Sequence, residues 1–184
     1  MIPFASEETA ASFDHPLEIL HACHGKIQRQ LDTLQKLAAY LPVHGCDRQA
    51  QQAAQSILRY FDTAGQFHHQ DEEENLFPAL LAMTVPDEVQ VKTLIERLLA
   101  EHAVMFAAWG EVRAVLVRIA EGIETPLPDR LVENLTVSYT KHIDREETEL
   151  LPLAARLLSQ QQLIQLGQCM AERRGANYPA APAG

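Results

Sequence analysis

Residues spaced alternately three and four apart along residues 14–41 constrain the fold more than any other feature of the sequence. The positions are Leu17, Leu20, His24, Ile27, Leu31, Leu34, Ala38 and Leu41, all apolar except for one histidine. In an α-helix this spacing places every member on one face, so it predicts a helix whose stripe packs against other helices. Asp14 can cap its first turn, and Pro16 fits there because the first N–H groups of a helix have no partner.

Three further segments have helical periodicity, and stretches containing proline or glycine separate them. They span about residues 48–81, 88–121 and 129–158, and a shorter amphipathic segment covers residues 161–173. In the segment 129–158, the expected inward positions are Leu131, Leu135, Ser138, His142, Glu146, Glu149, Leu153 and Leu157. Four helices of comparable length with short connections favour an all-α, up-down-up-down four-helix bundle with a short extra C-terminal helix.

The same segments predict how the chain is divided. We expect residues 1–13 to form an N-terminal arm and residues 14–158 to form the four-helix bundle. Residues 159–184 are expected to contain the short helix and a mobile tail, because chain ends rich in small residues are poorly ordered.

The charge balance argues against some classes of partner. The chain carries 25 acidic and 15 basic residues, which gives a formal net charge of −10. Such a protein is repelled by phosphate backbones and anionic lipid, so we expect neither nucleic acid nor membrane as a partner. No apolar run approaches the roughly 20 residues that span a bilayer, and the N-terminus lacks the pattern of a secretion signal. Cys23, Cys46 and Cys169 are scattered, as in a reducing compartment, so we expect a cytoplasmic protein.

Polar residues interrupt the apolar stripes at one level of each predicted helix. The histidines are His24, His68, His102 and His142, and glutamates follow two of them by four residues, at Glu72 and Glu146. Residues at i and i+4 of a helix lie on the same face, with Cβ atoms about 5–6 Å apart. Each imidazole and carboxylate pair can therefore bind one cation or reach two adjacent cations.

A shared metal site is the simplest explanation for these polar positions. Burying such groups without partners costs several kcal/mol each, and a metal ion removes that cost because it binds neutral imidazole nitrogens and carboxylate oxygens. A single histidine on an inward face is more often a hydrogen-bonded core residue, and a single His-x-x-x-Glu pair is usually a surface contact. One polar cluster on each of four helices is much harder to explain in that way.

The chain also contains an internal repetition. The segments QFHHQDEEENLFPAL and YTKHIDREETELLPLA both contain a histidine, three intervening residues and two glutamates, with a proline ten residues after the histidine. The sequence therefore indicates two helical hairpins of related design. Such repetition suits a site with two metal ions, each bound mainly by one half.

These motifs resemble those of the hemerythrin family in its bacterial HHE cation-binding form. The most specific are the H-H-x-x-E-E-x-x-L-F-P run from His68 to Pro78 and the H-x-x-x-E-E-x-x-x-L-P run from His142 to Pro152, and the resemblance covers about residues 14–158. It implies two iron ions, Fe2+ or Fe3+, joined by carboxylates and by an oxo or hydroxo group. The implied ligands are His24, His68, Glu72, His102, His142 and Glu146, with the glutamates as bridges and the histidines at the ends.

One position departs from the family pattern. Oxygen-carrying hemerythrins have a second histidine four residues after the third-helix histidine, and here that residue is Phe106. A metal position is then free for water, substrate or another side chain. His69 is the nearest candidate for an additional ligand, with a solvated or ligand-orienting role as the alternative, and Glu101 and Tyr139 lie near the same level. The departure weakens the case for reversible oxygen carriage more than the case for metal binding.

The leading hypothesis is a non-haem di-iron protein that binds O2, NO or a related small molecule for sensing, scavenging or iron handling. The first alternative is a di-iron enzyme, either a reductase of NO or peroxide or an oxidase, because turnover needs an open metal position. The second alternative is a metal-stabilised interaction module in which zinc or iron holds the bundle together. We expect binding rather than turnover.

Overall fold

The computed structural model describes residues 12–83 and 88–178, and every regular element among these residues is a helix. The elements are α1 (Pro16–His44), α2 (Arg48–Phe61), α3 (Ala64–Gln70), η1 (Asp71–Leu76), α4 (Phe77–Leu81), α5 (Glu88–Ala120), α6 (Asp129–Arg145), η2 (Glu146–Leu150), α7 (Leu151–Leu157) and α8 (Gln160–Arg173). The elements η1 and η2 are π-helical turns that lie within longer helical rods.

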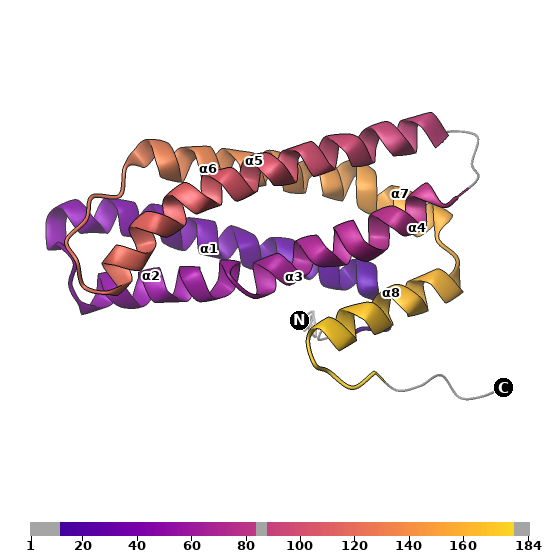
Figure 1. Ribbon diagram of the computed structural model, residues 1–184, viewed down its shortest axis with the longest axis horizontal. Helices are drawn as coiled ribbons and strands as arrows, with labels where there is room; N and C mark the ends of the chain where they lie inside the picture. The colour runs from indigo at the N-terminus through magenta and orange to yellow at the C-terminus, as the bar shows by residue number, and fades with distance from the viewer. Residues whose placement is uncertain (1–11, 84–87, 179–184) are drawn as a thin grey trace, which may run out of the picture.

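The rods run alternately in opposite directions (Figure 1). After α1, the rod formed by α2, α3, η1 and α4 returns along it; α5 then runs back, and α6, η2 and α7 return again. Both α1 and α5 pack against α2 and α6, so four rods close around one core. The predicted all-α, up-down-up-down four-helix bundle with a short extra C-terminal helix is confirmed.

The core consists of two apolar clusters with a buried polar layer between them. Along α1, Cys23 belongs to one cluster and Ile27 to the other, and the buried His24 separates them. Along α5, His102 separates Leu98 from Met105 in the same way. Apolar packing on both sides therefore holds the polar layer in the middle of the bundle.

A π turn begins at or beside the inward glutamate in two of the rods. The Phe77 N–H donates to the carbonyl of Glu72, and the Leu151 N–H donates to the carbonyl of Glu146, so each bond spans five residues. A proline follows directly in both rods. Proline has no N–H and its ring collides with the carbonyl four residues earlier in a regular helix, so the wider turn relieves this conflict.

The π turn in the last rod changes which residues face the core. The prediction that Glu149 points inward was wrong, because Glu149 is exposed. Leu153 and Leu157 are half-buried and pack at the edge of the apolar cluster instead of in its centre. The buried stripe of this rod is Leu131, Leu135, Tyr139, His142, Glu146, Leu150, Ala154 and Leu158. Ser138, which lies before the π turn, is half-buried, and its neighbour Tyr139 is the buried residue there. A π turn holds one more residue than the α-helical turn it replaces, and this moves the register beyond it by one.

The helix predicted over residues 48–81 is interrupted at Asp62 and Thr63. The side chains of Arg113 and Trp109 on α5 both donate to the Asp62 carboxylate, with nitrogen–oxygen distances of 2.9 and 3.3 Å. Thr63 has a non-helical backbone (φ −131°), and its hydroxyl donates to the carbonyl four residues earlier. The contacts of Asp62 with α5 therefore compete with helical geometry, although the apolar spacing of the sequence continues through this point.

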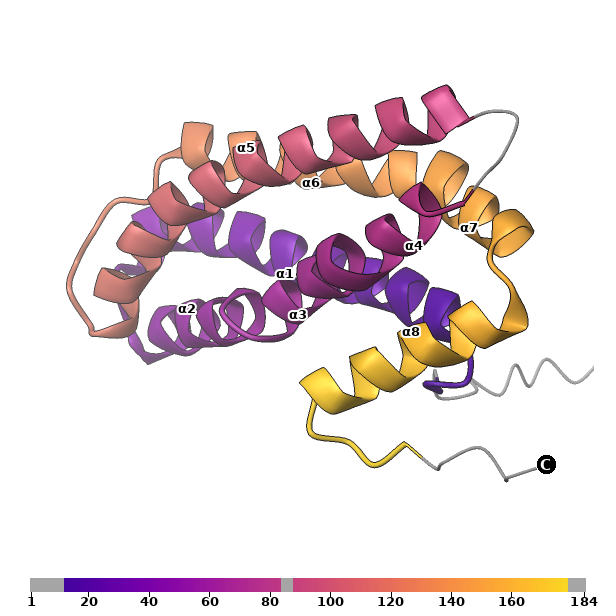
Figure 2. The same ribbon diagram turned by 45° about the vertical axis from the view of Figure 1, so that its right-hand side comes forward.

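The helix α8 lies on the outside of the bundle, beside η1 and the start of α1 (Figure 2). Ser159 and Gln162 form a reciprocal cap at its start, which satisfies two N–H groups that a helix otherwise leaves free. Leu166 and Met170 are buried in the apolar cluster nearest this end of the bundle. The apolar side of α8 thus extends that cluster.

Two predictions concern residues that the structure describes only in part. The N-terminal arm, residues 1–13, lies almost entirely outside the described residues, as does the tail from residue 179 onward.

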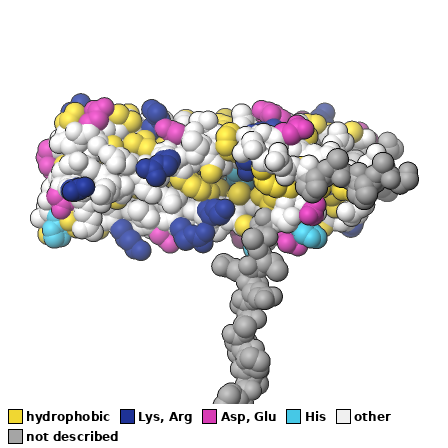
Figure 3. Space-filling view, turned by 90° about the horizontal axis from the view of Figure 1, so that it is seen from below, with side chains coloured by type: hydrophobic (Ala, Val, Ile, Leu, Met, Phe, Trp, Pro, Cys, Tyr) yellow, Lys and Arg dark blue, Asp and Glu magenta, His cyan; other side chains and the backbone are white. Residues whose placement is uncertain are grey.

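Within residues 12–83 and 88–178, no helix has the length and apolar character needed to cross a membrane. On the face seen in Figure 3, Lys and Arg side chains are interspersed with Asp and Glu side chains, so both signs of charge share this face.

Candidate metal centre

The polar layer brings together side chains from all four rods. Its buried polar and charged residues are His24, His68, His69, Asp71, Glu72, His102, His142 and Glu146, each at most 4% exposed. Seven of these offer an imidazole nitrogen or carboxylate oxygen within three overlapping groups, and Asp71 is directed away from them toward α8. So dense a set of buried polar groups is costly unless each group finds a partner.

Two glutamates connect the two sides of the layer. Ligand atoms of His24, His68, Glu72 and Glu146 all lie within 4.8 Å of one another. The same holds for Glu72, Glu146, His102 and His142, and again for His69, His102 and His142. Glu72 and Glu146 belong to both four-residue groups, so carboxylates lie between a side with two imidazoles and a side with three.

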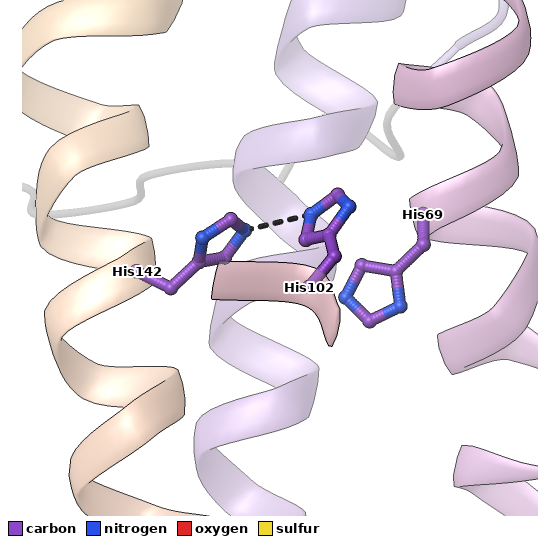
Figure 4. A group of neighbouring side chains, drawn as sticks. All are labelled: His69, His102 and His142. Atoms are coloured by element: carbon purple, nitrogen blue, oxygen red, sulfur yellow. Dashed lines mark hydrogen bonds between the residues drawn. The ribbon is translucent and has the colours of Figure 1, made fainter. Parts of the chain in front are cut away.

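The side with three imidazoles draws on three different helices (Figure 4). His69 comes from α3, His102 from α5 and His142 from α6, and the His69 and His102 ring centroids lie 4.4 Å apart. The Nε2 atoms of His102 and His142 lie 3.0 Å apart. The three rings therefore converge on a common space.

Carboxylates at the edge of the layer contact the outward nitrogens of three histidines. The Nδ1 atom of His24 lies 2.5 Å from Glu147, that of His102 lies 2.5 Å from Glu73, and that of His142 lies 3.1 Å from Glu101. Each carboxylate accepts a hydrogen bond from the Nδ1–H group. In a neutral ring the lone pair then lies on Nε2 and points into the layer.

The close contact between Nε2 of His102 and Nε2 of His142 depends on where the protons of the two rings lie. When both rings are neutral and donate from Nδ1 to carboxylates, the two Nε2 atoms at 3.0 Å present lone pairs to each other. In the protonated form His142 Nε2 can instead donate to Glu146, 3.0 Å away. Two lone pairs at this distance repel unless a positive charge, a metal ion or a proton, lies close to both. The geometry is that of two ligands turned toward one cation.

Burial and neighbouring charges shift the pKa values in this layer in opposite directions. Burial lowers the pKa of His68 to about 3, and the positive charge of His24 adds to this effect. Burial also opposes the charge on His24, but the hydrogen bond and negative charge of Glu146, helped by Glu147, raise the pKa of His24 to about 9.

The pKa values of the two central glutamates, Glu72 and Glu146, are also shifted in opposite directions. Burial and the charge of Glu146 raise the pKa of Glu72 well above its usual value. Burial acts in the same sense on Glu146, but hydrogen bonds with His142 and His24 hold its pKa well below the usual value. Without a metal ion the layer thus balances its charge with protons, as expected for carboxylates that share one site.

The donor set fits a cation. Three buried ring nitrogens have no hydrogen-bond partner among the described residues: Nδ1 of His68 and both nitrogens of His69. The other inward atoms contact one another: His24 Nε2 and His142 Nε2 each lie 3.0 Å from a Glu146 oxygen, and the two Glu72 oxygens lie 3.4 and 3.5 Å from Nε2 of His68 and of His102. Imidazole nitrogen and carboxylate oxygen together suit divalent and trivalent transition metals such as iron, manganese or zinc. The convergence of these buried nitrogen and oxygen atoms therefore fits a metal-cation site.

The six residues predicted as ligands, His24, His68, Glu72, His102, His142 and Glu146, all lie in this layer. Their binding of metal stays a prediction. His69 is 3% exposed, so the alternative of a solvated side chain is excluded, whereas Phe106 is 43% exposed and its ring packs edge-on against His69. Of the groups considered for the position left by Phe106, His69 is therefore the best placed.

Sequence reasoning did not identify the groups that support the layer. Glu73 and Glu147 orient histidines, and Asp71 is fully buried in ion pairs with α8. The one available signal was the repetition, because Glu73 and Glu147 each follow the inward glutamate of their half.

Comparisons with known proteins agree with the composition of this layer. The family model of the hemerythrin HHE cation binding domain matches residues 15–154. An uncharacterized protein of Haemophilus influenzae is 30% identical over 164 residues, which cover 89% of this chain and 92% of that protein. The matched segment includes every residue of the three metal-ligand groups.

Proposed function

The chain belongs to the hemerythrin HHE cation-binding family, and from this premise we propose that it is a non-haem di-iron protein that binds O2, NO or a related small molecule. Cation binding follows from the family. The identity and number of the ions, the small molecule and the ligand residues belong to the proposal.

Two four-residue groups of candidate ligands, which share Glu72 and Glu146, support a count of two ions. We assign His24 and His68 to one iron and His69, His102 and His142 to the other, with Glu72 and Glu146 between them. Both carboxylates belong to two groups whose ligand atoms lie within 4.8 Å of one another. Seven ligands exceed what one ion of ordinary coordination number accepts from protein side chains, whereas two ions use all of them.

The contact between His102 and His142 carries the proposal. Their Nε2 atoms lie 3.0 Å apart while Glu101 and Glu73 contact the opposite nitrogens. A cation between the rings converts this repulsion into two bonds. A proton can relieve the contact too, but it leaves Nδ1 of His68 and both ring nitrogens of His69 without a hydrogen-bond partner among the described residues.

Iron, when bound, supplies redox-active Lewis-acid centres that can hold a diatomic molecule. The chain's own residues orient the imidazoles, because Glu73, Glu101 and Glu147 accept at Nδ1 and leave Nε2 directed into the layer. Apolar clusters on both sides of the layer limit the access of water.

The halves of the layer are unequal, which suggests where a small molecule binds. Ile143 occupies, one residue after His142, the place that His69 occupies after His68, and it is a half-buried apolar residue. The side of His24 and His68 therefore has one imidazole fewer. We propose that the exchangeable position lies on that side.

A di-iron reductase or oxidase is the second candidate, and the unequal halves favour it, because turnover also needs an exchangeable position. The discriminating measurement is consumption of NO or peroxide in the presence of an electron donor. Consumption beyond one equivalent per site would establish the enzyme. A metal-stabilised interaction module, the third candidate, requires that zinc replaces iron without loss of function.

The first test is elemental analysis of protein purified without a histidine tag, combined with an absorption spectrum after anaerobic loading with Fe(II) and exposure to air. We expect about two irons per chain and near-ultraviolet charge-transfer bands after oxidation. One zinc ion, or no metal in a stoichiometric amount after loading, would overturn the di-iron assignment.

The ligand assignment is tested with the double variant Glu72→Gln/Glu146→Gln, which keeps the shape of both side chains and removes their charge. We expect it to lose most of its bound metal. The matched control is Glu121→Gln/Glu133→Gln, which removes two exposed carboxylates and should retain metal at the wild-type level. Full metal retention by the first variant would exclude the bridging role.

A further inference from the structure

Asp71 is fully buried directly before Glu72, and two arginines at the end of α8 hold its carboxylate. Arg173 Nη1 contacts one carboxylate oxygen, and Arg174 Nη2 donates to the other at 2.6 Å. A buried carboxylate without such partners is strongly unfavourable. These ion pairs therefore tie η1 to a helix that lies outside the four rods.

Arg173 contacts several residues on the outer face of η1. Besides Asp71, its guanidinium donates to the Glu74 carboxylate at 2.8 Å and to the Asn75 side-chain oxygen at 2.9 Å. Glu72, in the same turn, is fully buried in the candidate metal centre. A planar guanidinium with five donors suits such a multiple contact, which restrains the turn as a unit.

Arg174 extends this support toward the preceding helix. Its guanidinium lies 5.7 Å from the centroid of the Phe67 ring, and it donates to the carbonyl of Met170 at 3.0 Å. Phe67 directly precedes His68 in α3. The two arginines therefore contact residues on both sides of the His68–Glu72 segment.

The second π turn is supported in a different way. Arg145 stands directly before Glu146, as Asp71 stands before Glu72, and it forms an ion pair with Glu101 of α5. The support of η2 therefore comes from within the bundle, whereas that of η1 comes from α8. The two halves of the chain repeat the ligand pattern but not its support.

We infer that Arg173 and Arg174 are positioning residues for the metal centre and act through Asp71 to hold η1 in the geometry that directs Glu72 inward. The inference rests on the proposed function, because it concerns the same ligand. It makes α8 part of the centre as well as a cover for apolar surface. Without the ion pairs, we expect the backbone of η1 to leave its π-helical conformation more readily.

The first test needs no metal. Hydrogen exchange is compared in the metal-free wild type, in Arg173→Ala/Arg174→Ala and in Glu172→Ala, which alters an exposed neighbour on the same helix. In the double variant we expect exchange in residues 71–77 to accelerate about tenfold or more, because local opening governs exchange. Exchange in residues 146–151 should stay at the wild-type rate, and Glu172→Ala should leave both turns unchanged.

The second test measures the centre itself. The same proteins are loaded with Fe(II) under anaerobic conditions and titrated with a chelator. We expect the double arginine variant to bind iron about 10–100-fold more weakly, the usual effect of removing groups that orient a ligand. Asp71→Asn should weaken iron binding in the same direction. This variant keeps both arginines and the partners of Arg173 on Glu74 and Asn75, so it tests the link through Asp71 separately from the loss of the arginine side chains.

The outcomes separate this inference from the proposed function. Equal exchange in η1 of the wild type and the double variant would overturn the inference, as would equal acceleration in both π turns, which a general loss of stability produces. If the wild type binds no iron but η1 alone opens in the double variant, the proposed function fails while the link from α8 to η1 stands. Iron binding that is unchanged in both the arginine variant and Asp71→Asn would reject the positioning role.

Discussion

Glu73 and Glu147 occupy equivalent positions in the two halves of the chain, and each lies 2.5 Å from the Nδ1 atom of a histidine on another helix. Glu73 contacts His102 on α5, and Glu147 contacts His24 on α1. The internal repetition therefore includes the groups that orient the candidate ligands as well as the ligands themselves. An orienting carboxylate raises the basicity of the imidazole and selects the tautomer that can bind metal.

The first prediction concerns these two carboxylates. Glu73→Gln and Glu147→Gln should each weaken metal binding about 10–100-fold, because an amide cannot stabilise the same imidazole tautomer as well as a carboxylate. Competition with a chelator of known affinity measures the effect. Glu111→Gln, on an exposed face of α5, is the control. Wild-type affinity in both variants would show that the orienting contacts do not contribute.

The second prediction concerns His69. His69→Gln should lower the affinity of the His102 side about tenfold or more, because a nitrogen ligand is lost and a polar amide is buried in its place. Metal stoichiometry and the absorption spectrum of the loaded protein are the measurements. His44→Gln, an exposed histidine at the end of α1, should behave like the wild type. An unaltered spectrum and affinity in His69→Gln would mean that His69 is not a ligand.

The third prediction is a pH dependence of the metal-free protein. The pKa of His24 rises from 6.5 to about 9 in the folded chain. A raised pKa means that the folded state binds the proton more tightly, so this stabilisation is complete below pH 6.5 and is lost as the pH rises to about 9. The loss is on the order of 3 kcal/mol for a shift of this size. The raised pKa of Glu72 acts in the same direction.

Urea denaturation of the metal-free protein at pH 6.5 and pH 9 measures this difference. The pKa of His68 is lowered to about 3, so its effect on stability lies below pH 6.5 and does not enter this window. In His24→Gln most of the decrease between the two pH values should disappear. A wild-type free energy of unfolding that does not fall over this range would contradict the prediction.

The fourth prediction concerns the packing of α8. A Cβ atom at Gly167 would lie 2.0 Å from the Phe13 carbonyl oxygen, a distance that only backbone movement can relieve. Gly167→Ala should therefore destabilise the protein by about 1–3 kcal/mol. Gly110, inside α5, has no heavy atom within 4 Å of such a Cβ, so Gly110→Ala should stabilise it by roughly 0.5–1 kcal/mol. Denaturant unfolding of both variants provides the comparison, and equal effects would contradict the close contact.

The sequence by itself determined the four helical rods, most of their inward faces and the level at which the polar residues meet. These features follow from local geometry, because residues three and four apart share one face of a helix wherever the helix lies. His24, His102 and the pair of His142 and Glu146 could therefore be assigned to one layer before any contact was known. The repetition of the two halves predicted a centre with two related sides for the same reason.

Only the tertiary structure decided the register beyond η2, the interruption at Asp62 and the burial of Asp71. Leu150 faces inward in place of Glu149 because a π turn adds one residue, and periodicity carries no sign of that addition. Asp62 is held by α5, and Asp71 is buried because Arg173 arrives from a distant part of the chain. The energy of these groups depends on partners that are remote in sequence, so their environment exists only once the helices have packed.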